Sequence, residues 1–324
     1  MKKIDYNKIM FIVAVILIVM FLLFIINDYK QIIYIKNASI VLNKVLIYRM
    51  LQFILPSIVL LYLYEQNTYL KNIKIHIQDN KLPKKFNCKI AQLSDFHNTN
   101  SKRLKVKLKN VLEQEKPDII VITGDLLDAR RTNIQTVKQF INMIKHIAPI
   151  YYVLGNHEAR ISNVHELITE VKNEGVHVIR NEVIKLEKAG ESIELIGLDD
   201  PGFFVTSLEE NIKEKIDIKL NELINSDSDK YRILLTHRPE LIDTYSKPDI
   251  DLIFTGHAHG GQIRIPFLGG IIAPGQGFFP KYTKGLYVKN DTKMIVSCGI
   301  GNSKFPFRLN NRPNIIFAIL ENKK

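Results

Sequence analysis

The stretch Phe254-Thr-Gly-His-Ala-His-Gly-Gly-Gln262 sets two histidines one residue apart, between an apolar run and a pair of glycines. In an extended or tightly turned backbone, side chains at positions i and i+2 point to the same side, so His257 and His259 project together. Two imidazoles at a strand end are typical of a metal site, although an isolated His-x-His pair is more often incidental. The hypothesis therefore depends on whether other segments supply further ligands.

Four other strand-like runs also end in residues that can bind metal ions. In open α/β sheets, sites form just beyond the carboxyl ends of the strands, so we expect these residues to share one edge. Taken singly, Asp-x-His could cap a helix, Gly-Asp and Gly-Asn are ordinary turn dipeptides, and His237 could be a packed core histidine. Five coincidences of this kind in one chain are hard to credit, which favours a joint site. The candidate residues are Asp95, His97, Asp125, Asp128, Asn156, His157, Glu158, His237, His257 and His259.

The types of ligand indicate which metals the site would bind. Histidine with aspartate and asparagine suits divalent Mn, Fe, Zn, Co or Ni. None of the five clusters contains a cysteine, and we expect Cys88 and Cys298 to be buried free thiols within apolar strands. The ligands outnumber what one ion with an open position requires. Two ions sharing a carboxylate would use them all, and such a pair, about 4 Å apart, suits displacement at phosphorus.

From about residue 72 onward, apolar runs of strand length alternate with segments of helical periodicity. This alternation predicts an α/β domain in which helices cover a sheet. Hydrophobic residues make up 46% of the chain, enough for a sizeable core. The expected strands are 86–94, 118–123, 150–154, 183–186, 193–198, 232–236, 252–255 and 315–320, and the expected helices are 103–115, 136–147, 164–172 and 212–224.

The N-terminal part of the chain is typical of a membrane anchor. Residues 9–26 are 18 consecutive apolar residues, long enough to nearly cross a bilayer as a helix, and no signal-peptide cleavage site follows them. A second span is predicted over 45–64, with Arg49 near its end; the alternative is a helix lying at the membrane surface. We therefore expect an anchor over 1–70, a basic linker and first strand over 71–85, and the main domain over 86–324.

Lysines flank both predicted spans, with Lys2, Lys3 and Lys8 before the first and six others between Lys71 and Lys89 after the second. This pattern predicts a hairpin with both ends in the cytoplasm; with one span the domain would lie outside the cell. The net charge of +12 favours anionic partners. Much of this charge lies next to the membrane, so the lipid bilayer is an expected partner and a specific nucleic acid is not.

The five blocks, in their order along the chain, resemble the calcineurin-like metallophosphoesterases. That pattern is Asp-x-His, Gly-Asp-x-x-Asp, Gly-Asn-His-Asp/Glu, a lone His, and Gly-His-x-His, and it is intact here between about residues 86 and 320. The resemblance implies a four-layer αββα sandwich of two mixed sheets with helices outside. It also implies hydrolysis of a phosphorylated substrate by a hydroxide that bridges two metal ions, without a covalent enzyme intermediate.

The resemblance further implies a role for each residue. Asp128 would position His157 or a neighbouring loop, and Glu158 would be structural. His157 would stabilise the transition state or protonate the leaving oxygen. The metal ligands would be Asp95, His97 and His259 at one ion, Asn156, His237 and His257 at the other, and Asp125 between the two.

Segments outside the blocks resemble bacterial membrane-anchored members, including enzymes that cleave the pyrophosphate of UDP-2,3-diacylglucosamine. These segments are Gly260-Gly261-Gln262, expected to bind substrate, Gly285-Leu286-Tyr287, Gly299-Ile-Gly301 and Phe307-Arg308. Asn314 departs from the Pro-Glu-Ile that this subgroup usually carries. A lipid-linked phosphate or pyrophosphate is therefore the leading substrate. The alternatives are a general phosphodiesterase or nucleotide phosphatase, a nuclease, and a catalytically silent metal-binding scaffold.

Overall fold

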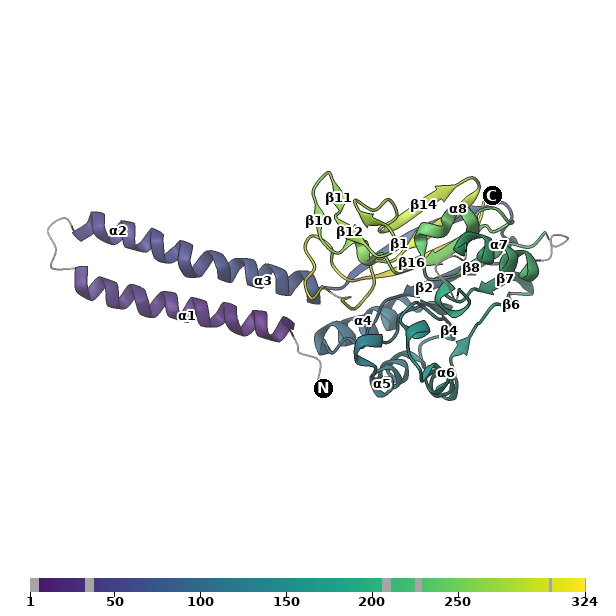
Figure 1. Ribbon diagram of the computed structural model, residues 1–324, viewed down its shortest axis with the longest axis horizontal. Helices are drawn as coiled ribbons and strands as arrows, with labels where there is room; N and C mark the ends of the chain where they lie inside the picture. The colour runs from purple at the N-terminus through teal and green to yellow at the C-terminus, as the bar shows by residue number, and fades with distance from the viewer. Residues whose placement is uncertain (1–5, 33–37, 206–210, 225–228, 303–304, 324) are drawn as a thin grey trace. The chain divides into compact units, whose positions relative to one another are not determined.

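The computed structural model describes residues 6–32, 38–205, 211–224, 229–302 and 305–323 (Figure 1). The chain forms two compact units, Lys2–Tyr69 and Leu70–Lys324. Lys2 and Lys3, which contribute to the predicted orientation, lie outside the described residues.

The first unit consists of helices α1 (Tyr6–Ile32), α2 (Ala38–Arg49) and α3 (Leu55–Thr68), with a π-helical turn, η1 (Met50–Ile54), between the last two. Two stretches, Ile9–Ile32 and Ser39–Thr68, are long and apolar enough to cross a membrane. The predicted spans 9–26 and 45–64 lie within them. Arg49 is paired inside this unit, because its Nε lies 2.8 Å from Asp28 Oδ2.

The second unit contains two six-stranded sheets. In the first, the order is β1–β16–β2–β3–β4–β5, and every pair is parallel except β16 with β2. All five residues of β3, Ile-Ile-Val-Ile-Thr, are buried, as expected for a central parallel strand covered on both faces. These strands are β1 (Lys71–Asp79), β16 (Asn314–Asn322), β2 (Cys88–Leu93), β3 (Ile119–Thr123), β4 (Ile150–Val153) and β5 (His177–Val178).

The second sheet has the order β14–β15–β9–β8–β7–β6. Its outer pairs, β14–β15 and β6–β7, are antiparallel hairpins, and its inner pairs are parallel. Ala189 and Gly190 connect β6 to β7 with positive φ at both positions, as a two-residue hairpin turn requires. The strands are β14 (Gly285–Lys289), β15 (Thr292–Val296), β9 (Leu252–Thr255), β8 (Arg232–Leu235), β7 (Glu191–Gly197) and β6 (Glu182–Lys188).

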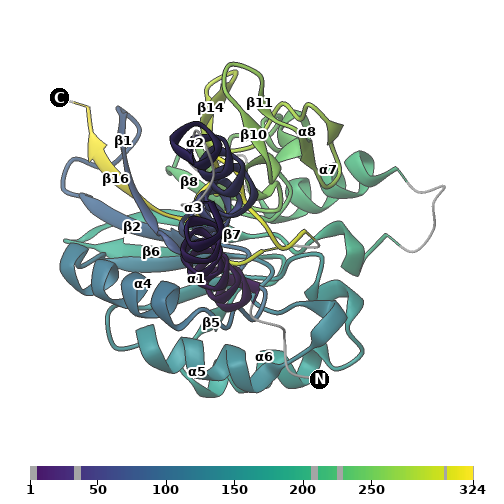
Figure 2. The same ribbon diagram turned by 90° about the vertical axis from the view of Figure 1, so that its left-hand side faces the viewer.

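Helices cover the outer faces of the two sheets, as Figure 2 shows. The first sheet packs on α4 (Lys102–Glu115), α5 (Ile134–Ile144) and α6 (Val164–Asn173), and the second packs on α7 (Ile212–Leu223) and α8 (Ile242–Tyr245). A third apolar core lies between the sheets. The predicted four-layer αββα sandwich of two mixed sheets is thereby confirmed.

Among the predicted helices, α5 (Ile134–Ile144) differs most from its predicted bounds of 136–147, and the other three differ by one residue each. Helix α5 begins at Ile134 because Asn133 caps it, its side chain accepting a hydrogen bond from Thr136 N at 2.9 Å. The remaining elements are short. They are the 3₁₀ turns η2 (Ala129–Arg131), η3 (Glu158–Arg160), η4 (Pro201–Phe203), η5 (Pro239–Leu241) and η6 (His259–Gly261), and the strand pairs β10 (Arg264–Ile265) with β11 (Gly269–Gly270) and β12 (Ile272–Ala273) with β13 (Gly277–Phe278).

Arg308 is fully buried and holds the loop that follows β15. Its guanidinium donates to the carbonyl oxygens of Cys298 and Gly301 and to Asn302 Oδ1. A Cβ added at Gly299, in the same loop, would lie 2.7 Å from Asp95 Cβ. The hydrogen bonds of Arg308 therefore hold this loop in contact with the side chain of Asp95, a candidate metal ligand.

We expect Arg308→Met to destabilise the second unit strongly, because it leaves several buried carbonyl oxygens without donors. Each such group costs about 1–3 kcal/mol, so the melting temperature of the full chain should fall by about 6 °C or more. Lys107→Met, which removes an exposed cation from α4, is the matched control and should melt like the parent protein. Equal melting temperatures for the two variants would contradict this account of Arg308.

Candidate metal centre

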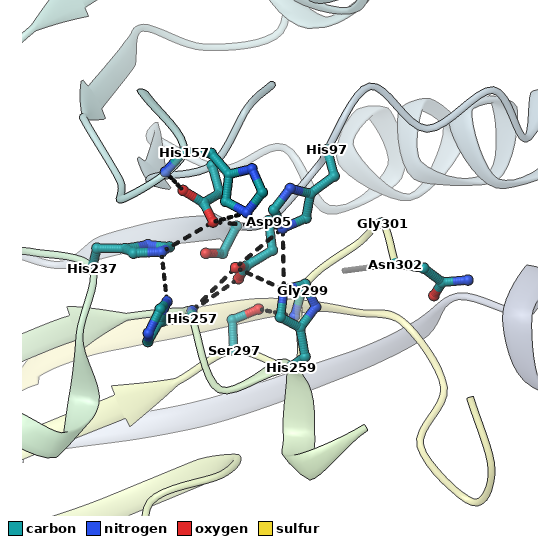
Figure 3. Close-up of polar contacts among 12 residues, drawn as sticks. Asp95, His97, His157, His237, His257, His259, Ser297, Gly299, Gly301 and Asn302 are labelled. Atoms are coloured by element: carbon teal, nitrogen blue, oxygen red, sulfur yellow. Dashed lines mark hydrogen bonds and ion pairs between the residues drawn. The ribbon is translucent and has the colours of Figure 1, made fainter. Parts of the chain in front are cut away.

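The parallel strands bring the predicted ligands to one edge of the sandwich. The strands β2, β3 and β4 of one sheet and β8 and β9 of the other are each followed by a ligand cluster. All of these side chains are buried, and Figure 3 shows several of them converging. The residues that meet here are Asp95, His97, Asp125, Asn156, His157, His237, His257 and His259.

A first group of ligand atoms comes from Asp95, His97 and His259. The Nε2 atoms of His97 and His259 lie 3.1 Å apart, and Asp95 Oδ1 lies 3.4 Å from His259 Nε2. Figure 3 shows the imidazole rings of His97 and His259 with these nitrogen atoms directed toward each other.

A second group surrounds His237 Nε2. This atom lies 3.1 Å from Asn156 Oδ1, 3.2 Å from His257 Nδ1 and 3.3 Å from Asp125 Oδ2. Asp125 Oδ2 also lies 3.6 Å from His97 Nε2, so it stands between the two groups.

These distances fit ligands of a shared cation. Donor atoms about 2.1 Å from one ion lie about 3.0–3.4 Å apart at octahedral to tetrahedral angles. Two imidazole nitrogens facing each other at 3.1 Å can share at most one proton, whereas both can donate to an ion. Burial also raises the pKa of Asp95 to about 6, and a buried carboxylate is costly without a positive partner. The residues therefore fit divalent metal ions.

Each of two candidate ligands is oriented by a hydrogen bond to its other polar atom, the one that does not face the proposed ion position. His237 Nδ1 donates to the carbonyl of Thr123 at 2.7 Å, which leaves Nε2 unprotonated in the neutral ring. Asp125 Oδ1 accepts from the backbone N–H of His157 at 2.9 Å, which leaves Oδ2 to face the histidines. Burial would raise the pKa of Asp125, but the positive potential of His237, His97 and His157 holds it well below its ordinary value.

The backbone at the strand ends is strained. Five candidate ligands adopt the left-handed conformation, with φ between 46° and 62°, which costs a non-glycine residue about 1–3 kcal/mol. Such strain is found where function requires a particular placement of side chains. The five residues are Asp95, His97, Asp125, His257 and His259.

His157 is held so that its Nε2 faces the two groups of candidate ligand atoms, which we call the metal groups. Its Nδ1 lies 2.9 Å from Ala129 N, which donates to it, and 3.5 Å from Asp128 Oδ1. Because Nδ1 accepts a hydrogen bond, the neutral ring carries its proton on Nε2, 3.9 Å from Asp125 Oδ2. Burial lowers the pKa of His157, but Asp128 and Asp125 outweigh that effect and raise it.

Asp128 and Glu158 contact the turns around the site. Asp128 pairs with Arg130 through both oxygens, at 2.8 and 3.0 Å from Nε and Nη2, in addition to its contact with His157. Glu158 is fully buried and accepts from the backbone N–H groups of Asp125, Leu127 and Gly155. Glu158 thus ties together the turns that follow β3 and β4.

The contacts of Gly260, Gly261 and Gln262 are with the chain itself. Gly261 packs against the backbone of Gly270, and Gln262 Nε2 donates to two carbonyl oxygens of the 305–307 segment. Their predicted role in binding substrate stays a prediction.

A pocket of about 250 Å³ opens beside the metal groups, and several of its lining residues were not predicted from the sequence. Arg238 is a neighbour of His237 and is held by Asp200 through two contacts of 2.7 and 2.9 Å. Arg160 lies two residues after Glu158 and is exposed. The only feature of the sequence that could have indicated Arg160 and Arg238 is that each lies within a few residues of a candidate ligand. The added lining residues are Arg130, Arg160, Arg238, Pro274 and Gly275.

Several proteins with similar sequences are named metallophosphoesterases, the class of protein that the ligand blocks predict. The family model for calcineurin-like phosphoesterases matches residues 88–261. The uncharacterized metallophosphoesterase YkoQ of Bacillus subtilis is 28% identical over 79% of this chain and 93% of its own length. The uncharacterized metallophosphoesterase Cj0846 of Campylobacter jejuni is 32% identical over 85% of this chain and 70% of its own. A bovine "transmembrane protein with metallophosphoesterase domain" is 30% identical over 76% and 56%.

The family model spans more than half of the chain, and its matched region contains every candidate metal ligand. The chain belongs to the calcineurin-like phosphoesterase family and is a metallophosphoesterase.

Proposed function

We propose that this protein is a membrane-tethered phosphohydrolase that uses two divalent metal ions. The observation that carries the proposal is the position of Asp125 Oδ2, 3.6 Å from His97 Nε2 and 3.3 Å from His237 Nε2. One carboxylate oxygen within reach of two histidine groups supports two neighbouring ions that share it. In this assignment Asp95, His97 and His259 hold one ion, and Asn156, His237 and His257 hold the other.

The pocket beside the ligands supports a phosphorylated substrate. Arg130, Arg160 and Arg238 line it, and arginine guanidinium groups suit phosphate oxygens in charge and shape. The two ions, when bound, would neutralise the phosphoryl oxygens and lower the pKa of a water molecule. His157 Nε2, which carries a proton in the neutral ring and faces the same space, would protonate the leaving oxygen. Asp128 positions that ring and Arg130 together.

A lipid-linked phosphate or pyrophosphate, resembling UDP-diacylglucosamine, is the proposed substrate class. Two stretches long and apolar enough to span a membrane support this class, as does a relative named as a transmembrane protein. Residues 1–70 would be the anchor, and the flanking lysines favour a cytoplasmic catalytic domain. A reporter fused to the C-terminus tests that orientation, and activity of an extracytoplasmic reporter alone would refute it.

The full chain should hydrolyse phosphorylated lipids in mixed micelles faster than water-soluble nucleotides or diesters. The reason is local concentration, because a tethered site meets amphiphiles in its own membrane. The measurement is phosphate or nucleotide release across a panel of lipid pyrophosphates, nucleotide sugars, phosphomonoesters, phosphodiesters and single-stranded DNA. Turnover of only the soluble esters would favour the general phosphodiesterase alternative, and preferred cleavage of DNA would favour the nuclease.

Metal removal should abolish hydrolysis and lower the melting temperature, because buried carboxylates and facing imidazoles then lose their cation. After chelation and reloading with Mn²⁺, elemental analysis should give about two ions per chain. Asp125→Asn should bind fewer ions and lose activity. Asp118→Asn, at an acidic residue outside the site, is its control. Full occupancy and turnover in Asp125→Asn would contradict the shared carboxylate, and unchanged turnover after chelation would favour the silent scaffold.

His157→Ala should slow hydrolysis by about 10²–10⁴-fold when the leaving alcohol is a poor one. With a nitrophenyl leaving group, which departs without a proton, the loss should be much smaller. His165→Ala removes an exposed histidine on α6 and serves as the control. If the two leaving groups showed equal losses, His157 would act on the phosphate and not as the proton donor.

A further inference from the structure

The short strand pairs β10–β11 and β12–β13 carry large apolar side chains that face solvent. Phe267 is fully exposed and Phe278 is 73% exposed. Soluble proteins rarely expose apolar side chains in such a group without a partner. We name this group the ribbon surface; its members are Ile265, Phe267, Leu268, Ile272, Phe278 and Phe279.

The members of the ribbon surface belong to one continuous piece of backbone. Ile272 lies directly opposite Phe278 in the second strand pair. Phe279 N donates to Ile271 O, and Ile271 N donates to Ile263 O, so the two strand pairs are joined. Phe267 and Phe279 both have positive φ, which is rare for bulky residues and turns them away from the regular strand pattern.

Positive charges lie beside these apolar side chains. Arg264 is on β10, and Lys281 follows the second strand pair and is exposed. Lys284 follows Thr283, whose Oγ1 lies 3.0 Å from Arg264 Nη1, and burial together with the nearby charges of Arg264 and Lys71 lowers the pKa of Lys284. An apolar surface with basic residues beside it matches the interface of an anionic bilayer.

Strands β10, β11 and β12 lie at the end of the second unit at which the chain enters it (Figure 1). Lys71 N donates to Pro313 O, and a few residues earlier Leu309 O accepts from Arg264 N. The second candidate membrane stretch ends at Thr68. Three residues span at most about 11 Å, so the start of β1 must remain close to the end of that stretch in any arrangement of the two units.

The same backbone forms one wall of the candidate active site. Pro274 and Gly275, in the turn between β12 and β13, line the pocket beside the metal groups. Gly261, two residues after His259, packs against Gly270 so closely that an added Cβ would lie 2.5 Å from the Gly270 Cα. A partner of the ribbon surface would therefore lie next to the mouth of the pocket.

We propose that the ribbon surface inserts into the headgroup region of the bilayer and holds the pocket mouth at the membrane surface. A second copy of the chain is a poorer occupant, because a self-contact would bring the lysines and Arg264 of both copies together. The consequence for substrate selection rests on the proposed phosphohydrolase function: a phosphorylated lipid would reach the metal groups without leaving its leaflet. The insertion itself does not depend on that function.

The chain contains no tryptophan, so single substitutions provide unambiguous fluorescent probes. The test uses the full chain in vesicles of phosphatidylcholine and phosphatidylglycerol, with or without bromine on the acyl chains. The probes are Phe267→Trp and Phe278→Trp. Ile218→Trp, at an exposed apolar position on α7, is the matched control, and Phe11→Trp reports on α1.

Brominated lipid should quench the emission of Phe267→Trp and Phe278→Trp and leave Ile218→Trp unchanged. Absence of quenching at both ribbon positions would overturn the proposal, and so would equal quenching at position 218, which would mean that the whole domain adheres. Concentration-dependent quenching between labelled chains in place of quenching by lipid would identify a second copy as the occupant. Lack of quenching of Phe11→Trp would refute the membrane anchor itself, which is a separate proposal.

A double variant, Phe267→Ser with Phe278→Ser, separates this proposal from the proposed function. Hydrolysis of a phosphorylated lipid in vesicles should fall several-fold, while hydrolysis of a soluble nitrophenyl ester should stay at the parent rate. A parent protein that hydrolyses neither substrate would refute the proposed function and leave the quenching result standing. Equal rates on vesicles for the parent and the double variant would refute the role of the ribbon surface in substrate access.

Discussion

The geometry of the candidate metal centre depends on one buried carboxylate, that of Asp125. Its Oδ1 accepts from the backbone of His157, its own N–H donates to Glu158, and its Oδ2 faces His97 and His237. Every hydrogen bond in this set fixes the direction in which Oδ2 points. Burying a carboxylate costs free energy unless positive charge compensates it, so this arrangement is one that a bound cation would stabilise.

Steric limits explain why the ligand blocks contain glycine. A Cβ at Gly155 would lie 2.3 Å from Asp125 Oδ1, one at Gly256 would lie 1.8 Å from Ser94 Oγ, and one at Gly124 would lie 2.5 Å from His237 Nδ1. Each glycine lets a side chain that follows another strand approach its backbone, and for Gly256 these side chains are Ser94 and the candidate ligand Asp95. The recurring Gly-Asp, Gly-Asn-His and Gly-His pairs are therefore packing requirements of two sheets meeting at one edge, in addition to being turn signals.

Local patterns in the sequence predicted the strands at whose ends the candidate ligands lie, and the family resemblance implied the four layers that the structure shows. Apolar runs of strand length identified β2, β3, β4, β8 and β9, and polar residues at their ends identified the site. Contacts between distant segments could not be predicted this way. Nothing local indicates that β1 pairs with β16 or that Arg49 pairs with Asp28. The two-residue strands β10 to β13 are too short to show periodicity, so the ribbon surface and the pocket wall at Pro274 were missed.

The turn between β12 and β13 connects the ribbon surface directly to the wall of the pocket beside the candidate ligands. Ile272 and Phe278 form a cross-strand pair, and the residues that connect their strands include Pro274 and Gly275 of the pocket wall. Gly275 also packs on Glu240, whose carboxylate lies 3.9 Å from His257 Nε2. Immobilising the pair at a membrane surface, as we propose, would therefore restrict the pocket wall within one turn of the candidate metal ligand His257. In that proposal, membrane contact and substrate access would depend on the same few residues.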